Sequence, residues 1–149
     1  MDDIRNFIQM TDKIGTSGQP TPEQFEKIAA ADYKAVINLA MPNSTHAIPD
    51  EGTLVSRAGM HYVHIPVPWE NPTAEHLKSF IRIMRAYDGE KVWVHCALNM
   101  RVSAFMHQYL RIEKGWSDAA ASNTVLNQWA PEMAAEWKRF LSLSAEDLV

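Results

Sequence analysis

Short apolar runs and longer segments with helical spacing alternate along this chain. Residues 35–39 and 91–96 form mainly apolar, β-branched runs of strand length, which is typical of strands buried on both faces. Elsewhere apolar residues recur three and four positions apart, which marks the buried face of a helix, as in Leu77, Phe80, Ile81 and Met84. This alternation predicts an α/β fold with a small, mostly parallel sheet of about four strands flanked by helices.

Turn and capping residues set the expected boundaries. Thr21, Pro22 and Gln24 together favour a helix start, and Thr73 caps a second helix. The proline-rich segment 66–72 has to be a loop, because proline lacks the N–H donor that regular structure requires. The expected elements are a short amphipathic turn at 4–8, strands at 13–17, 35–39, 61–66 and 91–95, and helices at 21–32, 51–58, 73–87, 101–114, 117–129 and 131–143.

The bulk properties indicate one globular domain spanning residues 1–149. The chain is 46% hydrophobic and 21% charged, and its net charge of −4 comes from interspersed acids and bases, so we expect no nucleic-acid partner. Neither a membrane span nor a signal-peptide pattern is visible. We therefore expect a cytoplasmic protein without a membrane partner, although an export signal already removed would leave no trace. Its cysteine and histidine spacing predicts no metal site.

The only cysteine, Cys96, lies where the predicted central strand gives way to a helix. The free N–H groups at a helix start and the positive end of its dipole favour anions, including a thiolate. Arg101 adds a permanent charge and a planar fork of donors that suits two oxygens of a phosphate or sulfate. The arrangement predicts a nucleophile beneath an oxyanion cradle, whereas a merely packed, inert cysteine is the plain alternative.

These residues resemble a known family. His95-Cys96 followed by Arg101 resembles the phosphate-binding loop of the cysteine-based tyrosine and dual-specificity phosphatases, with four residues between Cys and Arg where that superfamily has five. The chain is most similar to the phosphatase-like domain of the bacterial beta-lactamase-hydrolase-like proteins, whose Cys-x-x-Gly-x-Arg loop matches residues 96–101 except at Asn99. Residues 16–21 and 36–39 also resemble that domain, so the resemblance covers residues 14–109.

The resemblance implies a phosphatase fold and hydrolysis of a phosphomonoester through a phosphocysteine intermediate, with no cofactor. Cys96 is then the nucleophile, and the expected substrate is a phosphorylated small molecule or a phosphoprotein. Glu70 is the candidate general acid, Ser103 a candidate partner of the thiolate or leaving group, and His95 a residue that orients the loop. The expected anion-binding groups are Arg101 and the backbone N–H groups of Ala97, Leu98, Asn99, Met100, Arg101 and Val102.

Two other functions remain open. Rhodaneses share the four-residue spacing, so Cys96 could instead carry a persulfide in a sulfurtransferase, which needs no general acid. Alternatively, a guanidinium placed one residue early could prevent turnover and leave a module that only binds phosphate or a phosphoprotein. For Ser103, a hydrogen bond to its own helix backbone competes with a catalytic role.

Overall fold

In the computed structural model, which describes residues 1–149, a five-stranded sheet has the strand order β1-β2-β5-β3-β4. The first two strands are antiparallel and the other neighbours are parallel. The strands are β1 (Ile8–Thr11), β2 (Ile14–Ser17), β3 (Ala35–Asn38), β4 (His61–His64) and β5 (Val92–His95). The helices are α1 (Pro22–Ala30), α2 (Glu51–Arg57), α3 (Ala74–Ala86), α4 (Met100–Ile112), α5 (Thr124–Trp129) and α6 (Ala135–Leu141), with 3-10 turns at Ala130–Glu132 and Ala145–Leu148.

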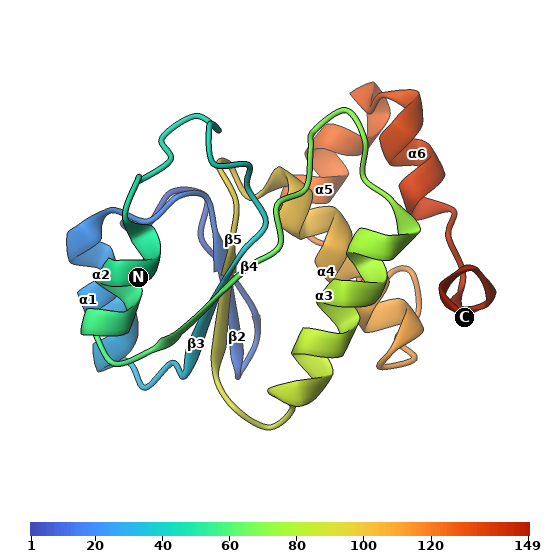
Figure 1. The fold of residues 1–149 in the computed structure, drawn as a ribbon. Coiled ribbons are helices and arrows are strands. Elements are labelled where there is room, and N and C mark those ends of the chain that lie inside the picture. The colour runs from blue at the N-terminus through green and yellow to red at the C-terminus, as the bar shows by residue number, and fades with distance from the viewer.

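Helices cover both faces of the sheet, with α1 and α2 on one side and α3 and α4 on the other (Figure 1). Two of these helices start where capping residues predict. The Thr21 hydroxyl accepts from the N–H of Gln24, whose side chain accepts from the N–H of Thr21. Thr73 makes the corresponding pair of bonds with His76 at the start of α3. The α/β fold with a mostly parallel sheet is thereby confirmed.

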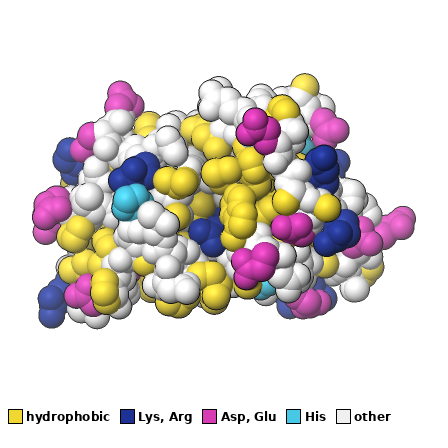
Figure 2. All heavy atoms as spheres, turned by 90° about the horizontal axis from the view of Figure 1, so that it is seen from above, with side chains coloured by type: hydrophobic (Ala, Val, Ile, Leu, Met, Phe, Trp, Pro, Cys, Tyr) yellow, Lys and Arg dark blue, Asp and Glu magenta, His cyan; other side chains and the backbone are white.

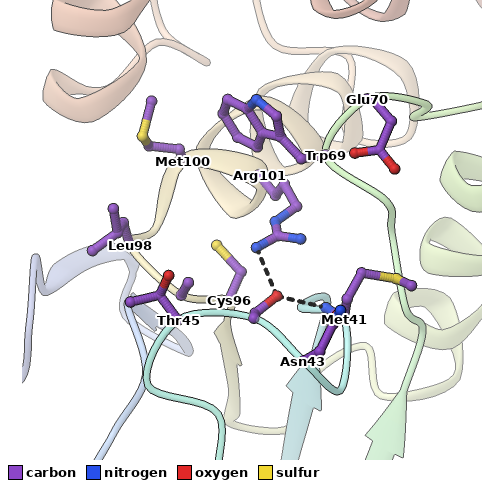
Figure 3. A pocket seen from close by; sticks show the side chains of 11 residues that line it. Met41, Asn43, Thr45, Trp69, Glu70, Cys96, Leu98, Met100 and Arg101 are labelled. Carbon is purple, nitrogen blue, oxygen red and sulfur yellow. Dashed lines mark hydrogen bonds between the residues drawn. The ribbon is translucent and has the colours of Figure 1, made fainter.

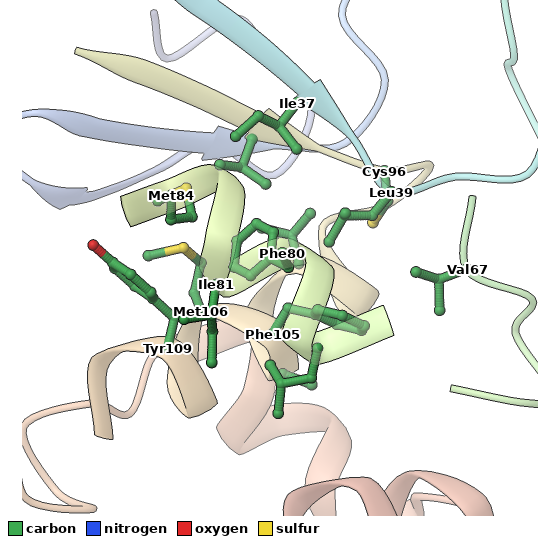
Figure 4. Close-up of a cluster of buried hydrophobic side chains, with 14 of the residues drawn as sticks. Ile37, Leu39, Val67, Phe80, Ile81, Met84, Cys96, Phe105, Met106 and Tyr109 are labelled. Atoms are coloured by element: carbon green, nitrogen blue, oxygen red, sulfur yellow. The ribbon is translucent and has the colours of Figure 1, made fainter. Parts of the chain in front are cut away.

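Each face of the sheet has its own hydrophobic core. The larger core packs the sheet against α3 and α4, where the rings of Phe80 and Phe105 meet edge to face with centroids 5.6 Å apart (Figure 4). The smaller core lies under α1 and α2 and includes Val36 and Trp93 from the central strands. Burying one such large apolar side chain contributes about 1.5–3 kcal/mol. Both faces of β3 and β5 are therefore apolar, which explains their unbroken runs.

Three expectations about the ends of the chain were wrong. Residues 8–11 form the edge strand β1 rather than part of an amphipathic turn, because a tight turn at residues 12–13 folds them back onto β2. Helix α5 begins only at Thr124, since the Asn123 side chain caps it by accepting from the N–H of Leu126. The expected helix at 131–143 is interrupted at Met133, which has an extended backbone and a buried side chain.

The parallel strands bring three loops to one edge of the sheet. Loop 41–50 follows β3, loop 65–73 follows β4, and residues 96–99 follow β5, which lies between β2 and β3. Ligands of such sheets bind outside the carboxyl ends of the strands. None of the helices is both long and apolar enough to cross a membrane.

Candidate active site

Cys96 lies at the floor of a cavity of about 480 Å³ at this edge of the sheet (Figure 3). Its backbone N–H donates to the carbonyl of Ser17 at 3.3 Å, so the sheet pairing of β5 continues up to the cysteine. The three loops supply the cavity walls, and the side chain of Cys96 is otherwise packed in the larger core. The lining residues are Met41, Asn43, Ser44, Thr45, Trp69, Glu70, Cys96, Ala97, Leu98, Met100 and Arg101.

The loop after Cys96 is held in one shape by contacts with the start of the chain. Asn99 has a left-handed backbone with φ of 67°, which asparagine tolerates better than most residues. Its side-chain amide donates to the carbonyl of Asn6 at 2.8 Å and to Oγ1 of Thr16 at 3.2 Å. Gly18 passes so close that a Cβ there would lie 2.5 Å from the carbonyl oxygen of Ala97. These contacts bring the predicted loop residues together around Cys96.

The backbone N–H groups of this loop are free. None of those from Ala97 to Val102 donates to an acceptor within the protein, and no side chain caps the start of α4. Helix starts leave such groups unsatisfied, and together with the helix dipole they attract an anion. The loop therefore offers a row of unused donors beside the thiol.

Arg101 is turned inward and is buried, with 6% of its surface exposed. Its Nη1 donates to the carbonyl of Val67 at 2.9 Å and its Nη2 to Oγ of Ser44 at 3.3 Å (Figure 3), while Nε has no partner. The guanidinium carbon lies 5.9 Å from the ring centroid of Trp69. No carboxylate lies within 4 Å of it. A buried charge without a counter-charge is costly, so this position suits an anionic ligand.

His95 lies behind the loop and is fully buried. Its Nε2 is 2.6 Å from Oε2 of Glu51, and its Nδ1 is 3.1 Å from the carbonyl oxygen of Cys96. The other carboxylate oxygen of Glu51 accepts from Gln19 at 2.7 Å. Burial by itself would raise the pKa of Glu51, but the charge of His95 and the hydrogen bonds from His95 and Gln19 outweigh it and lower that pKa.

The two remaining predicted residues differ in placement. Glu70 lines the cavity, and Figure 3 shows it on the opposite side of Arg101 from Leu98. It is exposed, and its carboxylate forms no ion pair. Ser103 does not line the cavity, and its hydroxyl donates to the carbonyl of Met100 at 2.6 Å. Of the two contacts considered for Ser103, the structure shows the one to its own helix.

Sequence reasoning missed several residues of the site. Ser44, Thr45 and Trp69 all belong to loops that follow parallel strands, and that position was the one available signal. Glu51 opens a predicted helix, and nothing in the periodicity marks its burial. Around the mouth of the cavity, Trp69 and Leu98 are about 40% exposed. Figure 2 shows hydrophobic side chains gathered in the middle of this face around a basic one, with most charges at the periphery.

The chain is similar to several known proteins. It is 28% identical over 98 residues to the beta-lactamase hydrolase-like protein of Xylella fastidiosa (strain Temecula1), a match that covers 64% of this chain but only 22% of that protein. The crystal structure of a DUF442 protein from Shewanella putrefaciens CN-32, a candidate phosphatase, superposes with a TM-score of 0.86 at 36% identity, covering 95% of this chain and 89% of the other.

A more distant structure shares the fold. Tk-PTP in its active form is 22% identical, with a TM-score of 0.74 over 95% of this chain and 97% of its own. The family model described as DSP-PTPase phosphatase fused to NAD+ kinase matches residues 8–141, which include every element from β1 to α6 as well as the Cys96 loop. This chain therefore belongs to that family of cysteine-based phosphatase domains.

Proposed function

We propose that this protein hydrolyses a phosphomonoester through a covalent phosphocysteine on Cys96. One observation carries the proposal. The cavity that has Cys96 at its floor is lined by Ala97, Leu98, Met100 and Arg101, whose backbone N–H groups are unused, and by the buried guanidinium of Arg101, which has no carboxylate partner and an unpaired Nε. A tetrahedral dianion with three free oxygens matches these donors in charge and geometry.

In the first step the Cys96 thiolate attacks phosphorus, the S–P bond forms, and the bond to the leaving oxygen breaks. The amides of residues 97–102 and the N–H groups that Arg101 does not use within the protein hold the other oxygens. Glu70 protonates the departing oxygen. Water then attacks the phosphocysteine, Glu70 takes up its proton, and phosphate leaves as the thiolate is restored.

The cavity walls favour a substrate with an apolar organic group. Arg101 is the one basic residue that lines the cavity, and Met41, Trp69, Leu98 and Met100 form much of its wall. An additional phosphate on the substrate would meet no second cation there. We therefore propose an aryl or alkyl monophosphate, free or on a peptide side chain, as the substrate class.

The test is turnover of p-nitrophenyl phosphate by wild type, Cys96→Ser and Glu70→Gln. Cys96→Ser should not turn over p-nitrophenyl phosphate. In a second assay with an alkyl phosphate, whose leaving group is poor, the rate of Glu70→Gln should be about 10²-fold or more below that of wild type. Glu75→Gln is the matched control, because Glu75 is an exposed acid outside the cavity. Equal rates for wild type and Cys96→Ser would reject the proposal. Phosphate binding without turnover would instead select a binding module.

A second candidate, sulfur transfer, has one observation in its favour. Glu70 is exposed and held by no ion pair, and a sulfurtransferase needs no general acid. The Cys96 thiolate would attack the outer sulfur of thiosulfate, the S–S bond of thiosulfate would break, and sulfite would leave with the electron pair. Mass spectrometry of the intact protein after thiosulfate treatment would then show one added sulfur atom, absent from Cys96→Ser.

A further inference from the structure

The loop that carries Glu70 packs against two tryptophans from helices α5 and α6. Trp69 directly precedes Glu70, and its ring stacks on that of Trp129 with centroids 5.2 Å apart and an interplanar angle of 30°. The same ring also packs against Trp137, with centroids 5.3 Å apart. Trp129 ends α5 and Trp137 lies in α6, and Figure 1 shows both helices beside the loop that joins β4 to α3. The proposed reaction gives neither tryptophan a role.

Trp137 also binds the backbone of this loop. Its indole Nε1–H donates to the carbonyl oxygen of Trp69 at 2.8 Å, and its side chain is fully buried. That carbonyl belongs to the peptide group that joins Trp69 to Glu70. Because a peptide group is planar, a bond to its oxygen also fixes the direction of the backbone at which Glu70 begins. The indole is held in turn, since its ring packs against Phe105 and Phe140 with centroids 6.3 Å and 5.4 Å away.

The side chain of Glu70 has no anchor of its own. It is exposed, and its carboxylate forms no ion pair. The backbone around it is held at several points instead. The carbonyl of Val67 accepts from Nη1 of Arg101 at 2.9 Å, and the N–H of Asn71 donates to the carbonyl of Pro68 at 3.1 Å, which closes a turn that contains Glu70. The place of the carboxylate at the cavity therefore depends on how this turn is fixed.

We propose that Trp137 is a positioning residue that holds Glu70 where it protonates the leaving oxygen. The proposal rests on the proposed function, because the place of Glu70 matters only if a leaving group has to be protonated. A general acid must lie within hydrogen-bond reach of that oxygen, and a displacement of about 1 Å can cost about 10²-fold in rate. The bond from Trp137 restricts the positions that the exposed carboxylate can take. Helix α6, which does not line the cavity, thereby takes part in the reaction.

The nature of the leaving group separates this role from simple packing. The ratio kcat/KM covers the steps up to departure of the leaving group, so the later hydrolysis of phosphocysteine does not enter it. p-Nitrophenolate is a stable anion that leaves with little help from an acid, whereas an alkoxide has to be protonated as it leaves. A displaced Glu70 therefore lowers kcat/KM for an alkyl phosphate and leaves that for p-nitrophenyl phosphate nearly unchanged. Lost packing that also disturbed the Cys96 loop would lower both.

The test compares p-nitrobenzyl phosphate, an alkyl phosphate, with the similarly shaped p-nitrophenyl phosphate in wild type and Trp137→Phe. Phenylalanine keeps an aromatic ring and removes the N–H donor. We expect kcat/KM to fall about tenfold with the benzyl compound and less than about twofold with the phenyl compound. In Glu70→Gln, which already lacks the acid, adding Trp137→Phe should cause no further loss. Trp116→Phe is the matched control, because Trp116 is partly exposed and lies outside the cavity.

Equal losses with the two substrates, no loss in folded Trp137→Phe, or a further loss in the Glu70→Gln background would overturn the proposal. If Trp137→Phe does not fold, benzothienylalanine at position 137 keeps the shape of the indole and replaces its N–H by sulfur, and it should give the same selective loss. Wild type that hydrolyses neither substrate rejects the proposed function and this inference with it. An active wild type whose two rates fall together in Trp137→Phe rejects this inference alone.

Discussion

Replacing Arg101 by methionine should separate anion binding from folding. Methionine keeps much of the apolar stem and removes the charge. The variant loses two charge-assisted hydrogen bonds, to Val67 and Ser44, each worth about 1.5–3 kcal/mol. It also removes a buried guanidinium that has no carboxylate partner, whose desolvation costs several kcal/mol. Because these terms oppose each other, we expect the free energy of unfolding without phosphate to change by about 1 kcal/mol or less.

Phosphate should stabilise wild type and barely affect Arg101→Met. At a phosphate concentration of about 100 times Kd, binding adds about 2.7 kcal/mol, or roughly 5–10 °C in Tm for a domain of this size. Losing one strong oxyanion donor weakens binding by about 10²–10³-fold. At the same concentration the variant would then gain only about 0.4 kcal/mol or less, which is below about 2 °C.

The assay is thermal unfolding with and without phosphate, followed by circular dichroism. Arg111→Met is the matched control. Arg111 lies on the same helix, near its other end, where it pairs with Asp118 at 3.2 Å and does not line the cavity. It should keep the full phosphate shift. An equal shift in wild type and Arg101→Met would refute the reasoning, since the guanidinium would then contribute nothing to the anion site.

Three further predictions concern the support of the loop. Gly18→Ala should reduce turnover of p-nitrophenyl phosphate by about 10²-fold. The new Cβ would lie 2.5 Å from the carbonyl oxygen of Ala97, which is too close, so that carbonyl and the loop after Cys96 would have to move. In urea titrations the free energy of unfolding of Asn99→Ala should be about 1–2 kcal/mol lower than that of Asn99→Gly. Both variants lose the contacts of the side-chain amide, and only alanine strains the left-handed backbone. Glu51 has a lower pKa in the folded protein than in the unfolded chain, so its ionised carboxylate stabilises the fold above the unfolded-state pKa, and this stabilisation disappears as pH falls through the folded-state pKa. Wild type should therefore lose stability below pH 4.5. In urea titrations over the same pH range, Glu51→Gln should lose less stability than wild type.

Each of these three predictions has a contradicting result. Normal turnover in Gly18→Ala would mean that the loop accommodates the methyl group without moving. Equal stability of the two Asn99 variants would show that the left-handed backbone carries no strain. Identical acid sensitivity of wild type and Glu51→Gln would mean that Glu51 is not held ionised by its partners.

The sequence by itself determined most of the elements and singled out the loop after Cys96. Strand runs, helical spacing and the capping residues Thr21 and Thr73 depend on neighbours within a few positions, so they are legible without a structure. The order of elements also fixed that the loops after β4 and β5 share one edge. Cys96 and Arg101 could also be singled out from local sequence, because only four residues lie between them and both lie at one strand-to-helix junction.

Only the tertiary structure decided what surrounds these residues. The partners of Arg101 come from loops 34 and 57 positions away, and Glu51 reaches His95 across 44 positions. The edge strand β1 likewise depends on pairing with β2, since a short segment has no stable conformation of its own. Such contacts leave no periodic trace in the sequence, because they are set by how separate elements pack together.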